Sequence, residues 1–153
     1  KMGPAAGWKA QKALEESEHV VGMVMRGGGV GAIADKETAR VIGSIGLNKG
    51  SGRSNGRGRM IGYVLAVEFW GQGLVPEAVR ALMRHAFEDL QLDILSAVYY
   101  PFNVQSRRVM EKCGMQYEGT LRRASQIYSG EIYDDVCFSI TADEWKALPT
   151  DTE

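Results

Sequence analysis

The chain has 153 residues, of which 44% are hydrophobic and 24% are charged, with a formal net charge of −1. This length and composition are typical of one globular domain with a full core, and they exclude a disordered chain. A charge so close to zero gives no general attraction to nucleic acid or to an anionic membrane surface, which favours a small-molecule ligand at a local site.

The first third of the chain predicts a helix followed by strands. Residues 10–25 suit a helix, and residues 30–34 and 41–47 have the apolar, β-rich composition of two strands. Residues 49–59 contain closely spaced glycines and arginines, which indicates a hairpin loop. No apolar run is long enough to span a membrane and no signal peptide is recognisable, so we expect a cytoplasmic protein.

Residues 61–80 have the pattern of a strand, a glycine turn and a helix start. The opening part is apolar and β-rich, as in a buried strand. Gly71 and Gly73 let the backbone turn sharply, and Pro76 suits the first helical position because its φ is fixed and it has no N–H. We therefore expect a helix that starts near Val75 and holds an anion, such as a pyrophosphate, at its N-terminus. An ordinary tight turn would give the same weak G-x-G pattern.

Apolar residues in this helix repeat with the spacing of one face. They fall at i, i+3, i+4 and i+7, which places the face against a sheet. The residues are Val75, Ala78, Val79, Leu82, Met83, Ala86, Phe87 and Leu90. A strand at 94–100 and a short helix follow, with Asn103 as the N-cap and Gly114 as the left-handed residue that ends the helix.

The remaining segments complete a mixed α/β fold. Residues 118–128 and 133–140 are predicted as paired strands around a glycine turn, and residues 143–147 as a short helix. The element order predicts a mostly antiparallel central sheet flanked by helices. No repeat or second domain is visible, so we expect a single domain across residues 1–153.

The two cysteines, Cys113 and Cys137, give no metal site, because the sequence has neither a C-x-x-C motif nor a nearby histidine pair. We expect them to be reduced core thiols. A nucleophilic Cys113 would need a base partner, and neither His19 nor His85 has a sequence reason to approach it.

Two ordered motifs resemble a known family. They are G-Y-V-L-x-x-x-x-W-G-Q-G-L-V-P-E-A, which begins at Gly62, and N-V-Q-S-R-R-V-M-E-K-C-G-M, which begins at Asn103. Together they are similar to the GNAT acyltransferase superfamily, and most similar to its ribosomal-protein alanine N-acetyltransferases. The likeness runs from about Val41 to Trp145, and it implies a GNAT fold that uses acetyl-coenzyme A.

The resemblance also implies where the coenzyme lies. Its pantetheine would run beside the strand at Leu65 and Val67, and Asn103 would hold the pantetheine or a bound water. Its pyrophosphate would rest on Gly71, Gln72, Gly73, Leu74 and Val75. The sequence departs from the family at two positions. The branched Val75 stands where the family has Gly or Ala and would narrow the approach to the phosphates, and Met110 stands where many members carry a tyrosine acid.

The reaction implied by the resemblance is attack of an amine on a thioester. It needs a neutral amine, hydrogen-bond donors to the developing oxyanion, a proton for the departing thiolate, and close alignment. The pKa of an α-amine is about 8 and that of a lysine amine is about 10.4. A protein N-terminus is therefore partly neutral near neutral pH and depends least on a base. Ser106, matched to a serine that this branch retains, is the candidate proton donor to the thiolate. Glu68 ranks first as the base, with Glu118 and Asp134 behind it.

Several alternatives remain open at this stage. Ser106 and Asn103 also suit a purely capping role. A non-catalytic module would bind the coenzyme alone, or RNA through Arg53, Arg57 and Arg59. The acceptor is undetermined among a protein N-terminus, a polyamine, an amino acid and an antibiotic. Family members usually begin with a further strand and helix. Either the chain is short at its N-terminus, or a partner chain covers the open sheet edge, so a homodimer is a prediction.

Overall fold

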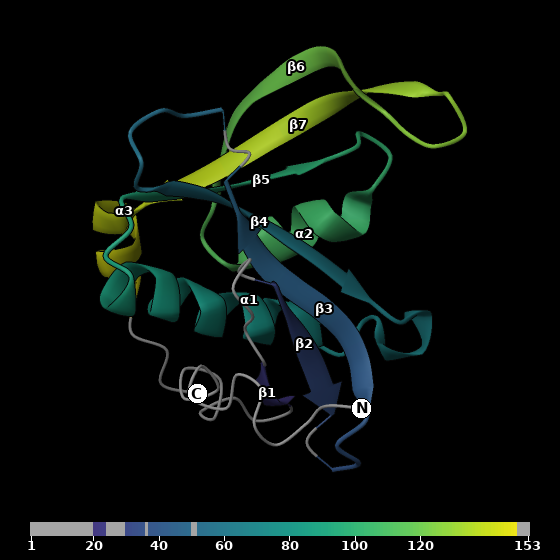
Figure 1. Ribbon diagram of the computed structural model, residues 1–153, viewed down its shortest axis with the longest axis vertical. Coiled ribbons are helices and arrows are strands. Elements are labelled where there is room, and N and C mark those ends of the chain that lie inside the picture. Colours follow the sequence, from purple (N-terminus) through teal and green to yellow (C-terminus); the bar gives the residue numbers. More distant parts are fainter. Residues whose placement is uncertain (1–19, 24–29, 36, 50–51, 150–153) are drawn as a thin grey trace.

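The computed structural model describes residues 20–23, 30–35, 37–49 and 52–149. Its centre is a seven-stranded sheet with the strand order β1-β2-β3-β4-β5-β7-β6 (Figure 1). The strands are β1 (Val20–Met23), β2 (Val30–Asp35), β3 (Val41–Asn48), β4 (Gly58–Leu65), β5 (Ile94–Tyr99), β6 (Gln116–Gln126) and β7 (Ile132–Thr141). The helices are α1 (Leu74–Arg84), α2 (Val104–Lys112) and α3 (Ala142–Lys146), with short helical turns η2 (Val67–Phe69) and η3 (His85–Asp89).

The sheet is antiparallel except where β4 meets β5. These two strands are parallel because α1 carries the chain across the sheet between them. Their pairing runs only from Gly58 and Ile94 to Met60 and Ser96. Beyond that point β4 and β5 run apart, as Figure 1 shows, which opens the sheet in its middle. The prediction of a mixed, mostly antiparallel sheet is confirmed.

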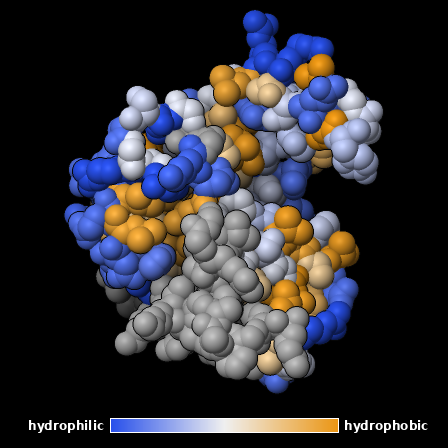
Figure 2. Space-filling view, viewed as in Figure 1, coloured by the Kyte–Doolittle hydropathy of each residue, from blue (hydrophilic) through white to orange (hydrophobic). Residues whose placement is uncertain are grey.

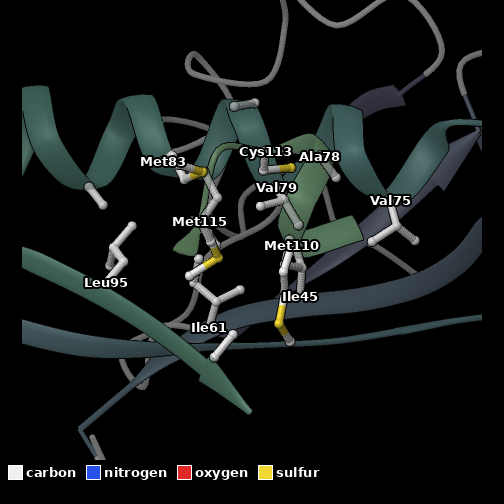
Figure 3. Close-up of a cluster of buried hydrophobic side chains, with 14 of the residues drawn as sticks. Ile45, Ile61, Val75, Ala78, Val79, Met83, Leu95, Met110, Cys113 and Met115 are labelled. Carbon is white, nitrogen blue, oxygen red and sulfur yellow. The ribbon is translucent and has the colours of Figure 1, made fainter. Parts of the chain in front are cut away.

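The core lies between one face of the sheet and the helices α1 and α2 (Figure 3). Alternate strand residues such as Ile45, Ile61 and Leu95 point toward the helices, as the period of a strand requires. From α1, Leu82 is fully buried and meets this face. Burying one such side chain contributes about 1.5–3 kcal/mol, so this layer fixes where both helices sit on the sheet.

The predicted apolar face of α1 is confirmed except at its end. Leu90 is 48% exposed, although the helical spacing placed it on the buried face. The reason is a π-helical turn at His85–Asp89, in which the Leu90 amide donates to the His85 carbonyl at 3.1 Å. The wider turn shifts the phase by one residue. Leu92, only 6% exposed, is the buried leucine that follows.

The predicted helix at 10–25 is wrong over its described part. Val20–Met23 form β1, which pairs with β2 in an antiparallel register of Val20 with Asp35 and Met23 with Ile33. Pairing with an open edge of the sheet therefore outweighs the local helical preference. Residues 10–19 and 24–25 lie outside the described residues. No helix of the described ranges has both the length and the apolar character to cross a bilayer.

Candidate active site

A groove of about 420 Å³ opens where β4 and β5 separate. One wall is the end of β4 with the loop that leads into α1, and the other wall is α2. Figure 2 shows the surface hollowed between the β6–β7 hairpin and the segment that follows β4. The lining residues from the strand and loop include Tyr63, Leu65, Trp70, Gly71, Gly73, Leu74 and Val75. Those from α2 include Asn103, Ser106, Arg108, Val109 and Lys112.

The loop before α1 presents unused backbone donors to this groove. Gly71 and Gly73 have φ values of 78° and 75°, which is the left-handed region that favours glycine. Gly73 is the N-cap of α1, whose first hydrogen bond runs from the Glu77 amide to the Gly73 carbonyl at 3.2 Å. None of the amides of residues 71–75 donates to another described residue. They therefore remain available to an anion at the positive end of the helix dipole.

The helix begins at Leu74 rather than near Val75, so Pro76 occupies the third helical position instead of the first. Its missing N–H costs nothing there, because the amides of the first turn have no partner within the helix. Val75 is 8% exposed and its side chain points into the core (Figure 3). Val75 is also among the residues that line the groove, so the expected narrowing of the anion site by this branched side chain stays a prediction.

The loop before α1 has open space beside its glycines and is anchored to β4, and both features suit a ligand. A Cβ built on Gly71 or Gly73 would meet nothing within 4 Å. The Trp70 indole N–H donates to the Leu65 carbonyl at 2.8 Å, which ties the loop to the end of β4. The glycines are therefore held in place and face open space.

The facing wall is α2 with its N-cap residue. The Asn103 side chain accepts a hydrogen bond from the Ser106 amide at 3.2 Å, so the predicted N-cap is confirmed. Both residues line the groove, as do Arg108 and Lys112, which the sequence analysis did not single out. Their i, i+4 spacing places the two cations on one helical face, and that spacing was the available signal.

Tyr63 is a third lining residue that the sequence did not reveal. It belongs to β4, lines the groove, and its hydroxyl donates to the Ser106 carbonyl at 3.4 Å. Burial raises the pKa of this phenol above its ordinary value, so the hydroxyl stays protonated at neutral pH. Its position two residues before Leu65, on the same face of the strand, was the signal that could have found it.

Met110 and Cys113 both turn away from the groove into the core. Met110 is 2% exposed, so no titratable group stands at the position of the family's tyrosine. The Cys113 thiol is also 2% exposed and lies 3.6 Å from the Pro76 carbonyl. Burial raises its pKa to about 11, which keeps it protonated. The core-thiol interpretation of Cys113 therefore agrees with its surroundings.

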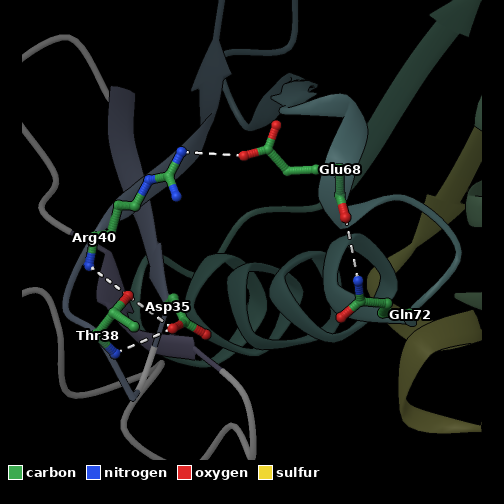
Figure 4. A network of polar contacts seen from close by, with 5 residues as sticks. All are labelled: Asp35, Thr38, Arg40, Glu68 and Gln72. Atoms are coloured by element: carbon green, nitrogen blue, oxygen red, sulfur yellow. Dashed lines mark hydrogen bonds and ion pairs between the residues drawn. The ribbon is translucent and has the colours of Figure 1, made fainter.

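Three of the predicted residues do not line the groove, namely Val67, Glu68 and Gln72. The Glu68 carboxylate is 3.0 Å from the Arg40 guanidinium, and the Gln72 amide donates to the Glu68 carbonyl (Figure 4). Arg40 stands beyond the Asp35–Thr38 turn between β2 and β3. This network holds Glu68 at the rim of the molecule, where its side chain is 60% exposed.

The lower-ranked base candidates also have partners. The Glu118 carboxylate forms an ion pair with Arg53, which joins β6 to the loop before β4. The Asp134 carboxylate accepts the Arg123 amide at 2.7 Å. Among the lining residues that the structure describes, none carries a carboxylate.

Comparisons with known proteins agree with this geometry. The family model described as an acetyltransferase (GNAT) domain matches residues 4–116. The chain is 35% identical over 114 residues to a protein named "uncharacterized N-acetyltransferase p20" of Bacillus licheniformis, which covers 74% of this chain and 62% of that protein.

Two solved structures are similar in fold. The ribosomal-protein-S5-alanine acetyltransferase of Vibrio fischeri superposes with a TM-score of 0.69 and 26% identity, over 76% of this chain and 62% of that one. RimJ of Mycobacterium smegmatis, solved with CoA-disulfide, superposes with a TM-score of 0.67 and 26% identity, over 76% of this chain and 55% of that one. This chain spans less than two thirds of each of these three relatives. The chain belongs to the GNAT acetyltransferase family, as its two motifs predict.

Proposed function

We propose that this chain transfers an acetyl group from acetyl-coenzyme A to a primary amine, by direct transfer in a ternary complex. The observation that carries the proposal is the groove between β4 and α2. One wall has Gly71, Gly73, Leu74 and Val75, whose amides are unused, and the other has Ser106 and the N-cap residue Asn103. A nucleotide thioester needs a phosphate site and an extended channel that ends at its sulfur, and this groove offers both.

The pyrophosphate is proposed to lie on the amides of Gly71, Gln72, Gly73, Leu74 and Val75. Arg108 and Lys112 face the same groove from α2 and would add positive charge for the phosphates of the coenzyme. The pantetheine would then run past Leu65 and Val67 into the gap that β4 and β5 leave between them. Support from relatives comes from RimJ, whose solved structure holds CoA-disulfide.

The catalytic roles follow from what the groove contains. Ser106 and Tyr63 carry the two hydroxyl groups of the lining, and Ser106 is proposed to interact with the sulfur directly or through water. None of the described residues that line the groove carries a carboxylate. Glu68, next in the sequence to the lining residue Phe69, is proposed to take the amine proton through water. Alignment of the reactants and a partly neutral α-amine, with a pKa of about 8, would supply the rest.

The favoured acceptor is a protein N-terminus, with a small amine as the second choice. The solved relatives with this fold include an acetyltransferase of the alanine terminus of ribosomal protein S5. Trp70, which lines the groove, is 49% exposed, and the exposed Phe102 and Val104 flank the lining residue Asn103 in the sequence. Exposed apolar side chains of this kind suit a peptide better than a polyamine.

The RNA-binding alternative has weaker support. Arg53 pairs with Glu118, the Arg57 side chain donates to the Gln91 carbonyl at 3.1 Å, and Arg59 donates to the Gly58 carbonyl at 2.8 Å. The three guanidinium groups are thus engaged in holding the loop before β4 against its neighbours. Loss of RNA retention in an Arg53→Ala/Arg57→Ala double variant would revive this alternative.

A homodimer remains part of the proposal. β6 is one of the two edge strands of the sheet, and its Leu121 is 61% exposed. Such an edge tends to recruit a partner strand. Sedimentation equilibrium should give twice the chain mass, and a monomeric mass at working concentration would count against the dimer.

Thiol release from acetyl-coenzyme A tests the function directly. A peptide with a free N-terminal alanine should release thiol, whereas the same peptide with an acetylated N-terminus and a free lysine should not, because its only amine is protonated at neutral pH. Coenzyme binding without turnover for any amine would indicate a non-catalytic module instead. A Glu68→Gln variant should lower kcat for the alanine peptide if Glu68 takes the amine proton, and Arg40→Gln should leave kcat unchanged.

A further inference from the structure

We propose that the Tyr63 hydroxyl donates a hydrogen bond to the departing coenzyme A sulfur, which makes it a catalytic residue of the strand wall of the groove. The inference rests on the proposed acetyl transfer. Nothing in the two sequence motifs assigned Tyr63 a role.

Tyr63 lies in the part of β4 that forms the groove wall. It stands on β4 between Ile61 and Leu65, on the face that looks toward α2, and its ring packs against the core. The groove lining includes Tyr63, Leu65 and Ser106 together. β4 has already separated from β5 here, because the pairing of these strands ends at Met60. The Tyr63 hydroxyl therefore lies in the gap into which the pantetheine would run.

The hydrogen bond that Tyr63 now makes can be exchanged at little cost. Its acceptor is the Ser106 carbonyl at 3.4 Å, a long contact for an O–H donor. Ser106 lies within α2, so its carbonyl also takes part in the helical ladder. A sulfur atom that enters the groove can replace this carbonyl as the acceptor without leaving it unsatisfied.

The chemistry of the phenol suits this role. It is protonated at neutral pH because burial raises its pKa, so the proton is present when charge develops on sulfur. A phenol is also a stronger donor than the serine hydroxyl of Ser106, and its rigid ring holds the proton in one place. The buried Met110 leaves α2 without a tyrosine, so the phenol of the groove is supplied by the strand instead.

The step balances as follows. The amine nitrogen uses its lone pair to form the C–N bond, and the C–S bond breaks with its electron pair going to sulfur. The Tyr63 O–H donates to this thiolate and keeps its own proton. The thiolate then takes a proton from water, and the proton that the amine loses leaves to water or to Glu68.

The first test compares Tyr63→Phe with Tyr128→Phe, a matched control whose side chain is fully exposed outside the groove. Tyr63→Phe should lower kcat about 100-fold, with the Kd for coenzyme A and the unfolding temperature unchanged, and Tyr128→Phe should change none of the three. A more acidic fluorinated tyrosine at position 63 should restore kcat and move the alkaline limb of the pH–rate profile to lower pH. A kcat of Tyr63→Phe within twofold of the original would overturn the proposal. A 100-fold loss of kcat in Ser106→Ala without a loss in Tyr63→Phe would overturn it as well.

A second measurement does not need turnover. The thiolate absorbance of bound coenzyme A reports the pKa of its thiol, which a hydrogen bond from Tyr63 should lower by about one unit. Tyr63→Phe should remove this shift, and an unchanged thiol pKa would contradict the proposal. If the thiol pKa is lowered but the protein transfers no acetyl group, the hydrogen bond from Tyr63 stands and the proposed acetyl transfer is rejected. Failure of the hydrogen bond and failure of the acetyl transfer are therefore distinguishable.

Discussion

The indole of Trp70 holds the carbonyl of Leu65 at 2.8 Å, and this one bond closes the loop between β4 and α1 onto the strand that it leaves. The Trp70 amide adds a second tie to the Val67 carbonyl at 3.0 Å. The loop is therefore anchored at this end and enters α1 at the other, and the two glycines between line the groove.

Replacing Trp70 by Phe should therefore weaken coenzyme binding without removing it. The variant keeps an aromatic ring but loses the indole donor, a loss of about 1 kcal/mol, which corresponds to roughly fivefold in Kd. Calorimetric titration with coenzyme A measures the change. Trp145→Phe alters a tryptophan that packs on Phe87 away from the groove, and it should leave the Kd unchanged. Equal effects of the two substitutions would refute the role of the indole bond.

Gly73 should tolerate no other L-residue well, and the reason is conformation rather than space. Its φ is 75° and a Cβ there meets nothing within 4 Å, so Gly73→Ala introduces backbone strain of about 1–2 kcal/mol. Denaturant unfolding should show that loss of stability, and the Kd for coenzyme A should rise as well. Gly130→Ala is the matched control, because Gly130 has a φ of 96° with equally open space, at the turn between β6 and β7. It should lose similar stability and keep its coenzyme affinity.

Arg108 and Lys112 should contribute the salt-dependent part of coenzyme binding. The double variant Arg108→Gln/Lys112→Gln should raise the Kd by roughly tenfold at low salt, since each charged contact contributes about 0.5–1 kcal/mol at partly exposed sites. The difference from the original protein should shrink as salt is added. Arg122→Gln removes a charge from β6 outside the groove and should have no effect. An identical salt dependence in the double variant would exclude both side chains from the phosphate site.

Much of this site could be predicted from the sequence, because its features depend on residues that are close together along the chain. Glycines at positions 71 and 73 favour a sharp turn, which the structure shows in the left-handed region, and Asn103 at the start of a helical stretch is recognisable as an N-cap. The buried face of α1 follows from its spacing, because a regular helix repeats every 3.6 residues. The two motifs that carry the family likeness consist of these same local features.

The residues that the sequence did not reveal depend on packing between distant segments. Tyr63 approaches Ser106 only because β4 separates from β5 and α2 lies across the gap. The π-helical turn that exposes Leu90 has no residue signature of its own. The position of Glu68 depends on Arg40, which is 28 residues away along the chain. Val20–Met23 became a strand because a partner edge was available.

The buried Cys113 thiol should make the protein less stable in alkaline solution. Its pKa is raised from 9.0 to about 11 in the folded chain, so the folded state keeps the proton that the unfolded state has already lost. The contribution, about 3 kcal/mol, is complete below pH 9 and is lost as pH rises toward 11. Denaturant unfolding at several pH values should show a steeper decline for the original protein than for Cys113→Ala. The same variant should keep its thiol-release activity, and loss of that activity with an intact fold would restore Cys113 as a nucleophile.

The central claim is that the backbone amides of residues 71–75 bind the diphosphate of the coenzyme. The most direct measurement is an amide NMR titration of the ¹⁵N-labelled chain with acetyl-coenzyme A. We predict saturable shifts concentrated on the amides of Gly71 to Val75, with smaller shifts on Asn103 and Ser106 across the groove. Shifts that avoid this loop, or the absence of any shift at millimolar coenzyme, would contradict the proposed site and the acetyl transfer that depends on it.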